Sequence, residues 1–289
     1  MSDDYQVKKV ELPADRDKRL ALGHKLFTNP YTNLFICSKK KSGKTNLIYN
    51  ILDQCADKRT TVLFFCSKLF KDDMYKSILN MLDAKGIGHI DRTSFIEHNR
   101  SVLNDIMITL DQPVVEAEEK PPIVKRPTRS TSWITERNRV KAEHKHSLAV
   151  VGSTILAKKK KRKKRRPRSK FIAPELIMLF DDLSSDLRHA DIAKLVKNNR
   201  HYKCMTIFSS QWMTDLMPAS IRQMDVVILF HAHTRDKLEA IYMKLDLNVT
   251  LEQFFAMYDM ATSSPFNFLY IDVSNCDFRH NFSKIILNS

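Results

Sequence analysis

Glycine is scarce in this sequence: only five of the 289 residues are Gly, which excludes generic glycine-rich flexible linkers. Cysteine is equally sparse, with five residues and no Cys-x-x-Cys pair. That pattern argues against a zinc-type site and against a disulfide framework. We interpret the cysteines as small buried apolar residues of a protein in a reducing compartment.

Long apolar runs are also missing. No stretch approaches the roughly 18 residues that a membrane-spanning helix needs, and the charged amino terminus has no signal-peptide core. We therefore expect an intracellular, soluble protein without a membrane span. The hydrophobic content of 43% is enough for the core of one large α/β domain or two small ones.

Acidic residues are outnumbered, because 48 Lys or Arg face 33 Asp or Glu and give a net charge of +15. Such an excess predicts a polyanionic partner, either nucleic acid or an anionic membrane. The excess is local: residues 113–170 hold 19 basic and 5 acidic residues, a net of +14 that leaves +1 for the rest. Basicity therefore belongs to one segment and not to the fold.

Short apolar runs alternate with amphipathic stretches along the rest of the chain. Most runs lack polar alternation, which is typical of strands buried on both faces of a parallel sheet. The alternation predicts a doubly wound α/β fold, with a mostly parallel central sheet flanked by helices. Predicted strands are 33–37, 61–66, 94–96, 176–180, 205–208, 226–230 and 268–273; predicted helices are 45–56, 72–84, 99–110, 186–199 and 234–245.

Residues 113–170 break this pattern with Pro- and Ser/Thr-rich stretches and few large apolar side chains. The composition predicts a basic, low-complexity insertion that is largely disordered on its own. We expect it to separate the two halves of one α/β core, 31–112 and 171–289, which follow an amino-terminal extension of residues 1–30.

The strongest motif follows the first predicted strand, where residues 38–45 read Ser-Lys-Lys-Lys-Ser-Gly-Lys-Thr before an amphipathic helix. A phosphate-binding P-loop, or Walker A motif, needs this strand–loop–helix context. Backbone N–H groups cradle phosphate oxygens there, and the helix dipole favours an anion. We expect ATP to bind at Ser38, Lys39, Lys40, Lys41, Ser42, Gly43, Lys44, Thr45 and Asn46.

Three residues of the loop have expected roles. Lys44 reaches the β- and γ-phosphates, the Thr45 hydroxyl ligates Mg²⁺, and Gly43 permits close approach of the backbone. Ser38 departs from the pattern, which usually has Gly at that position. The alternative interpretation is a Gly-Lys-Thr in an ordinary surface turn.

A second motif is Glu175–Asp182, an apolar strand that ends in the carboxylates Asp181 and Asp182 and has the Walker B form. Asp181 is expected to hold Mg²⁺ through water. Asp182 stands where many ATPases carry a Glu that activates the attacking water, and its shorter side chain leaves the role of general base open. The alternative is an ordinary strand with an Asp capping the next helix.

A third apolar strand ends at Gln211, which we expect to sense the γ-phosphate or to orient water; the alternative is a loop amide with ordinary partners. Arg200 precedes this strand and Arg222 precedes the next one. Either could act as an arginine finger across a subunit interface, or be a solvated side chain.

Taken in order, these motifs resemble those of the poxvirus-type genome-packaging ATPases of the FtsK–HerA superfamily, which occur in large DNA viruses, virophages and related elements. The resemblance covers residues 26–66 and 171–273, about half of the chain. It implies a RecA-like P-loop NTPase core and a homo-oligomeric ring, a hexamer or pentamer, that translocates double-stranded DNA into a preformed capsid. Residues that match by position are Lys44, Thr45, Asp181, Asp182, Gln211 and Arg200.

The same resemblance implies ATP and Mg²⁺ as cofactors and capsid or portal proteins as partners. It places the protein in a virus-infected host cell, either in the nucleus or in a cytoplasmic virus factory, with virion association as a further option.

The basic run at the end of the insertion allows three interpretations: non-specific binding of DNA phosphates, a nuclear localisation signal, or a solvated segment without a specific role. The first two are compatible with each other. The DNA-binding candidates are Lys158, Lys159, Lys160, Lys161, Arg162, Lys163, Lys164, Arg165, Arg166 and Arg168.

Three functions remain open from the sequence. The leading one is an ATP-driven packaging translocase, and the second is another P-loop DNA helicase or replication ATPase. The third is a DNA-binding scaffold that binds nucleotide without hydrolysing it, which Ser38 and Asp182 keep open. Small-molecule kinases share the P-loop, but they give no reason for the +14 segment.

Overall fold

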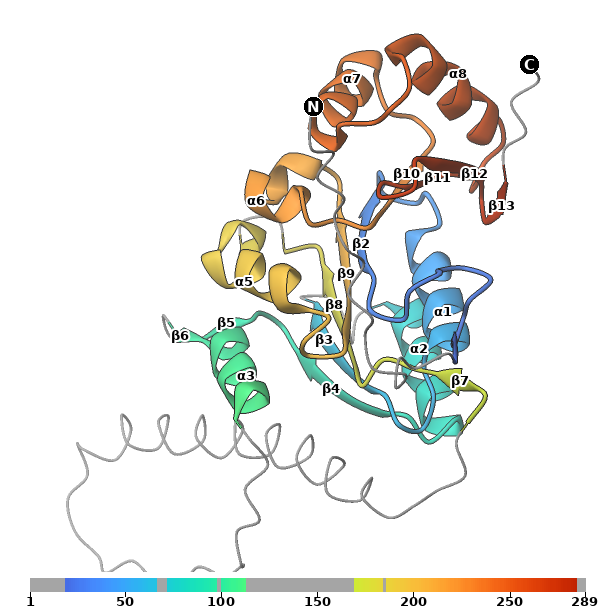
Figure 1. Cartoon of the computed structure of the whole chain (residues 1–289). Helices are drawn as coiled ribbons and strands as arrows, with labels where there is room; N and C mark the ends of the chain where they lie inside the picture. Colours follow the sequence, from blue (N-terminus) through green and yellow to red (C-terminus); the bar gives the residue numbers. More distant parts are fainter. Residues whose placement is uncertain (1–18, 67–71, 98–99, 113–168, 184–185, 285–289) are drawn as a thin grey trace, which may run out of the picture.

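The computed structural model describes residues 19–66, 72–97, 100–112, 169–183 and 186–284 (Figure 1). One nine-stranded sheet runs through the centre in the order β13-β12-β11-β10-β2-β9-β8-β3-β4. The six strands from β10 to β4 are parallel, and β11, β12 and β13 extend them antiparallel. The parallel strands are β2 (Asn33–Cys37), β3 (Thr61–Cys66), β4 (Gly88–Arg92), β8 (Leu176–Asp181), β9 (Cys204–Ser210) and β10 (Val226–Phe230). The antiparallel strands are β11 (Phe268–Asp272), β12 (Asp277–His280) and β13 (Ser283–Lys284).

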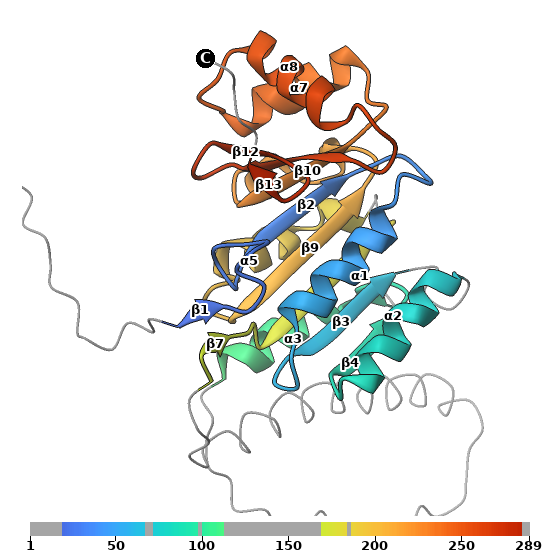
Figure 2. The ribbon, with the colours of Figure 1, turned by 90° about the vertical axis from the view of Figure 1, so that its right-hand side faces the viewer.

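Helices cover both faces of the sheet, as Figures 1 and 2 show. Hydrophobic side chains of α1 (Lys44–Cys55) and α2 (Asp73–Ala84) form one cluster with the sheet. A second cluster on the other face joins α3 (Val102–Asp111), α5 (Ala190–Asn198), α6 (Pro218–Ile221), α7 (Arg235–Leu245) and α8 (Leu251–Ala261). The predicted α/β class, with a mostly parallel central sheet flanked by helices, is confirmed.

Strand β2 shows why the apolar runs lack alternation. Leu34 and Ile36 belong to the cluster under α1 and α2, whereas Phe35 and Cys37 belong to the opposite cluster. All four side chains are fully buried, because each face of the strand is covered by helices. Four of the five cysteines are buried in the same way, and Cys276 is half-buried.

The predicted strand 94–96 does not belong to the main sheet: Phe95 is a buried loop side chain, only Ile96 lies in a short strand, and the edge strand of the main sheet is β4. An edge strand has one unpaired side and needs no apolar run, and β4 is half-buried along its whole length. The remaining short strands form two-stranded pairs outside the main sheet: β1 (Leu20–Ala21) with β7 (Phe171–Ile172), and β5 (Ile96–Glu97) with β6 (Arg100–Ser101).

Two helices also differ from the sequence prediction. The predicted helix 186–199 divides into a 3₁₀ turn, Asp186–Arg188, and α5, because His189 caps the second helix by accepting from the Asp191 N–H. Helix α8 was not predicted, although Thr250 and Gln253 form a capping box at its start.

The predicted halves 31–112 and 171–289 contribute interleaved strands to the same sheet, since β8 lies between β3 and β9. Most of the predicted extension 1–30 and nearly all of the predicted insertion 113–170 lie outside the described residues. Among the described helices, none is long and apolar enough to cross a membrane.

Candidate functional site

A pocket of about 470 Å³ opens at the carboxyl ends of the parallel strands. The residues that follow β2, β8 and β9 meet there, because parallel strands end at the same edge of a sheet. The predicted Walker A, Walker B and sensor segments are therefore brought together. The lining residues are Ser38, Lys40, Lys41, Ser42, Gly43, Lys44, Thr45, Asn46, Asp72, Met74, Tyr75, Asp181, Asp182, Gln211 and Phe266.

The loop between β2 and α1 has the backbone conformation of a phosphate cradle. Lys41 and Gly43 have φ values of 63° and 96°, and α1 begins at Lys44 with Gly43 as its N-cap. A Cβ at Gly43 would lie 3.1 Å from Cδ1 of Phe266, so both the left-handed φ and the close ring require glycine. The first residues of α1, Lys44, Thr45 and Asn46, line the pocket, and the N–H groups at a helix N-terminus, together with the helix dipole, favour an anion.

Ser38 fits the loop without glycine. Its backbone is outside the left-handed region, and its N–H donates to the carbonyl of Ser210 at 3.2 Å, which extends the pairing of β2 with β9. The hydroxyls of Ser38 and Ser42 are buried and have no hydrogen-bond partner within the described part of the chain. Buried hydroxyls at a pocket wall suit phosphate oxygens, because an unpaired buried donor costs free energy.

The Lys44 ammonium contacts the first Walker B carboxylate, with Nζ 2.8 Å from Oδ1 of Asp181. Asp181 is 4% exposed, and a buried carboxylate needs partners that compensate its charge. The Lys44 ion pair and the Tyr75 hydroxyl, which donates to Oδ2 at 2.7 Å, are these partners. Burial and the Asp181 carboxylate raise the pKa of Tyr75 well above its usual range. Tyr75 therefore remains a proton donor to Asp181 at any physiological pH.

Tyr75 is a site residue that the sequence analysis missed. It lies in the first turn of α2, 106 positions before Asp181, and nothing in the local pattern distinguishes it from a core aromatic. Phe266, in the loop between α8 and β11, was missed for the same reason, although its 63% exposure sets it apart once the fold is known.

Asp182 lines the pocket beside Asp181 in a left-handed conformation, with φ of 59°. Its N–H donates to the carbonyl of Ser209 at 3.3 Å. The sharp turn explains why the two consecutive carboxylates can reach the same cavity, since neighbours on a regular strand point to opposite faces. Aspartate tolerates this conformation better than most residues.

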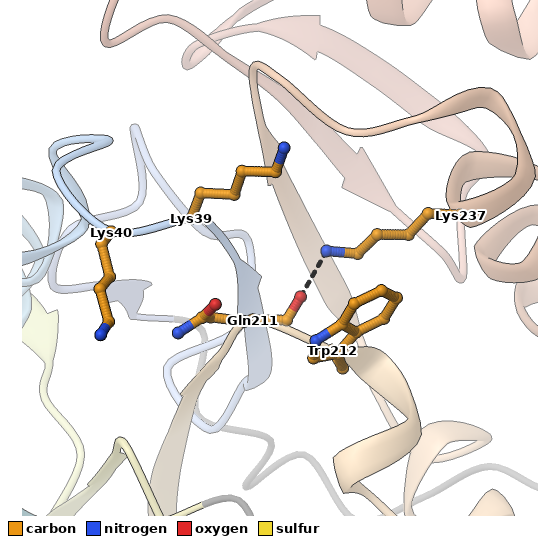
Figure 3. Close-up of a pocket in the computed structure, with 5 residues that line it drawn as sticks. All are labelled: Lys39, Lys40, Gln211, Trp212 and Lys237. Carbon is orange, nitrogen blue, oxygen red and sulfur yellow. Dashed lines mark hydrogen bonds between the residues drawn. The ribbon is translucent and has the colours of Figure 1, made fainter.

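Gln211 is brought to the same pocket, with its side-chain amide on the side of the loop that carries Lys40 (Figure 3). Its backbone carbonyl accepts hydrogen bonds from the Lys237 ammonium and, at 3.4 Å, from the Cys37 thiol. Burial raises the pKa of that thiol to about 11. Lys39, the remaining residue of the predicted nucleotide-binding set, lines an adjoining pocket.

Neither predicted arginine lies at this pocket. Arg200 precedes β9 and pairs with Asp225 at 3.1 Å, at the amino edge of the sheet, where Asp225 also accepts from the Asn33 N–H. Arg222 ends α6 just before β10 and is exposed. Both residues therefore lie away from the phosphate loop of the same chain. The predicted DNA-binding run 158–168 lies outside the described residues.

The pocket fits a metal-bound polyphosphate. Within the described ranges, no group of three or more His, Cys, Asp or Glu could hold a metal ion by itself. Asp181 and Thr45 can supply two oxygen ligands, which suits Mg²⁺, because this ion is usually bound by one or two protein ligands together with substrate phosphates and water. Lys44 and the N-terminus of α1 provide the complementary positive charge.

No family model matches the chain. An uncharacterised protein of Invertebrate iridescent virus 6, 075L, is 30% identical over 107 residues, which cover 36% of this chain and 42% of the viral protein. The genome-packaging NTPase B204 of Sulfolobus turreted icosahedral virus 2, crystallised with AMP, aligns at a TM-score of 0.49 and 17% identity over 90% of this chain and all of that one. EssC (ATPases 2 and 3) of Geobacillus thermodenitrificans aligns at 0.41 and 8% identity, over 84% of this chain and 38% of the other.

Proposed function

We propose that the protein binds ATP with Mg²⁺ in this pocket and hydrolyses it to move double-stranded DNA. The observation that carries the proposal is the contact of Lys44 with the buried Asp181 at the mouth of a glycine-dependent phosphate loop. A chance Gly-Lys-Thr turn gives no reason for a buried carboxylate from a distant strand to meet the lysine.

Each residue has a proposed role. Lys44 and the backbone of the loop bind the phosphates, and Thr45 and Asp181 hold Mg²⁺, which supplies Lewis-acid stabilisation of the phosphoryl oxygens when bound. Tyr75 positions Asp181 by hydrogen bonding to one carboxylate oxygen. Asp182 accepts the proton of the attacking water, and Gln211 orients that water.

The proposed output is packaging of a viral genome into a preformed capsid. Support for DNA packaging comes from the order of the motifs and from the +14 segment of residues 113–170. The iridescent virus protein that aligns with part of the chain supports a viral source. In a ring, the exposed Arg200 and Arg222 can face the nucleotide pocket of a neighbouring subunit, because neither residue lines the nucleotide pocket of its own chain. Capsid or portal proteins are the corresponding partners, inside an infected cell.

Steady-state ATP turnover, measured with and without linear duplex DNA at low and moderate salt, tests the proposal. Turnover that rises with duplex DNA supports a DNA motor. ATP turnover that is unchanged by duplex DNA would contradict translocation. ATP binding without any turnover would favour the non-hydrolysing scaffold.

Deletion of residues 158–168 tests the basic run separately. We expect lower affinity for duplex DNA and a flatter salt dependence, because each lost phosphate contact reduces the slope of log affinity against log salt by about 0.9. Turnover without DNA should be kept. An unchanged salt slope would remove this run from DNA binding.

A further inference from the structure

A second pocket, of about 350 Å³, adjoins the phosphate loop and is cationic with one aromatic wall. Figure 3 shows its five lining residues: Lys39, Lys40, Gln211, Trp212 and Lys237. Lys40 and Gln211 line the nucleotide pocket as well. The proposed roles of the nucleotide pocket do not use Trp212 or Lys237.

Trp212 and Lys237 form the wall farthest from the phosphate loop. The Lys237 ammonium lies 4.5 Å from the centroid of the Trp212 ring, a cation–π contact. Lys237 is only 8% exposed, whereas Trp212 is 54% exposed. The exposed indole leaves a flat apolar surface in water that a ligand could cover, and the ammonium beside it is largely shielded from water.

Both positive and negative groups surround Lys237. Burial is the main cause that lowers the pKa of Lys237; the Cys37 thiol and the Asp215 carboxylate act in the opposite direction, and the Lys39 ammonium lowers the pKa further. The nearby carboxylate is Asp215, which accepts a hydrogen bond from the Ser210 hydroxyl. A ligand with negative charge would gain from both lysines.

We propose that this pocket binds a phosphodiester of a nucleic-acid strand, with Lys39 and Lys237 on the phosphate and Trp212 against the adjoining sugar or base. Each nucleotide of a nucleic-acid strand carries a phosphate and a flat base close together. The phosphate suits the two lysines, and the base suits the indole. An acidic polypeptide would satisfy the lysines but leave the indole without a ring to stack on.

The inference rests on the proposed function and adds a contact through which DNA could influence hydrolysis. Lys237 donates to the backbone carbonyl of Gln211, whose side chain lies at the nucleotide pocket. A phosphate bound to Lys237 competes with that carbonyl for the ammonium. Occupancy of the second pocket would thus change the restraint on Gln211.

Tryptophan fluorescence of the full-length chain tests the proposal. The sequence has two tryptophans, so Trp133→Phe leaves Trp212 as the sole reporter. In the absence of ATP, we expect an oligothymidylate of about 10 nucleotides and linear duplex DNA to quench this fluorescence to saturation. Lys39→Met and Lys237→Met should each weaken the apparent affinity about 10-fold, and Lys194→Met, an exposed lysine on α5, should not.

Several outcomes would overturn the proposal. Oligonucleotide binding seen by anisotropy without any change in Trp212 fluorescence would place the contact elsewhere. Equal quenching by inorganic phosphate at matched phosphate concentration would indicate a free-phosphate site, and equal quenching by polyglutamate would indicate an acidic polypeptide. If circular dichroism shows that Lys237→Met is unfolded, the affinity of Lys39→Met alone tests the proposal. Lys39 is an exposed loop residue, so its replacement should leave the fold intact.

The failure of this inference differs from the failure of the proposed function. Quenching by DNA in a chain that hydrolyses no ATP would keep the pocket assignment and reject the motor. ATP turnover that rises with DNA, with no change in Trp212 fluorescence, would support the DNA motor and reject the second pocket as a DNA-binding site.

Discussion

Lys44 Nζ lies 2.8 Å from Asp181 Oδ1, although 137 positions separate the two residues in the chain. The pair joins the loop after β2 to the end of β8, two strands that do not touch because β9 lies between them. The ammonium is therefore placed where it neutralises a buried carboxylate or, when nucleotide is present, the phosphates.

Replacement of this lysine tests the assignment most directly. Lys44→Ala should lower ATP turnover at least about 100-fold, because a preorganised charge on the transferred phosphoryl group is lost. Lys76→Ala is the matched control, since Lys76 pairs with Asp73 on the exposed surface of α2 and should leave turnover unchanged. Equal turnover in Lys44→Ala and the parent protein would reject the P-loop assignment.

Tyr75→Phe should impair catalysis without creating a cavity in the core. It removes the hydroxyl that donates to Asp181 and keeps the ring. Loss of a hydrogen bond to a charged group costs about 1.5–3 kcal/mol, so we expect roughly a 10-fold higher Mg²⁺ concentration for half-maximal turnover. Tyr49→Phe on α1 is the control. A Mg²⁺ dependence equal to that of the parent would limit Tyr75 to packing.

Gly43→Ala should abolish nucleotide binding, because alanine is strained at a φ of 96° and its Cβ would lie 3.1 Å from the Phe266 ring. Gly86→Ala is the matched control: Gly86 also has a positive φ, of 65°, but the nearest atom to its Cβ would be Lys58 Cε at 3.8 Å. Both variants should lose about 1–2 kcal/mol of stability. Calorimetric titration with ATP should then detect loss of binding in Gly43→Ala alone.

Asp182→Asn should separate binding from hydrolysis. Asparagine accepts the same left-handed conformation, so the loop should persist and ATP should still bind. Turnover should fall by about 10²–10⁴-fold if Asp182 is the general base. Retention of full turnover in single-turnover assays would assign activation of water to another group.

Acid should destabilise the protein through His233. Burial, followed by the Lys237 charge, lowers the pKa of His233 to about 4 from an ordinary 6.5. The unfolded chain therefore takes up the proton first, and stability is full above pH 6.5 and falls by up to about 3 kcal/mol as the pH drops to 4. Urea unfolding of His233→Gln across this range should show a smaller loss. His201→Gln, on the exposed surface, should follow the parent; an unchanged slope in His233→Gln would contradict the assignment.

The sequence by itself determined the fold class and predicted which strand ends meet at the candidate site. Apolar strands without alternation require two covered faces, and β2, β3 and β10 lie where the runs predict them. The carboxyl-edge rule for parallel strands then places Ser38, Asp181 and Gln211 side by side from local patterns alone. Edge strand β4 was not predicted, because a half-buried strand need not contain an apolar run.

Only the tertiary structure decided which distant side chains complete the site. Tyr75 and Phe266 reach the pocket from α2 and from the loop before β11, and their local sequence is that of ordinary core or loop aromatics. It likewise decided that Arg200 pairs with Asp225 at the opposite edge of the sheet. A local pattern encodes backbone conformation and burial, whereas contacts over a hundred positions depend on strand order, which no single segment specifies.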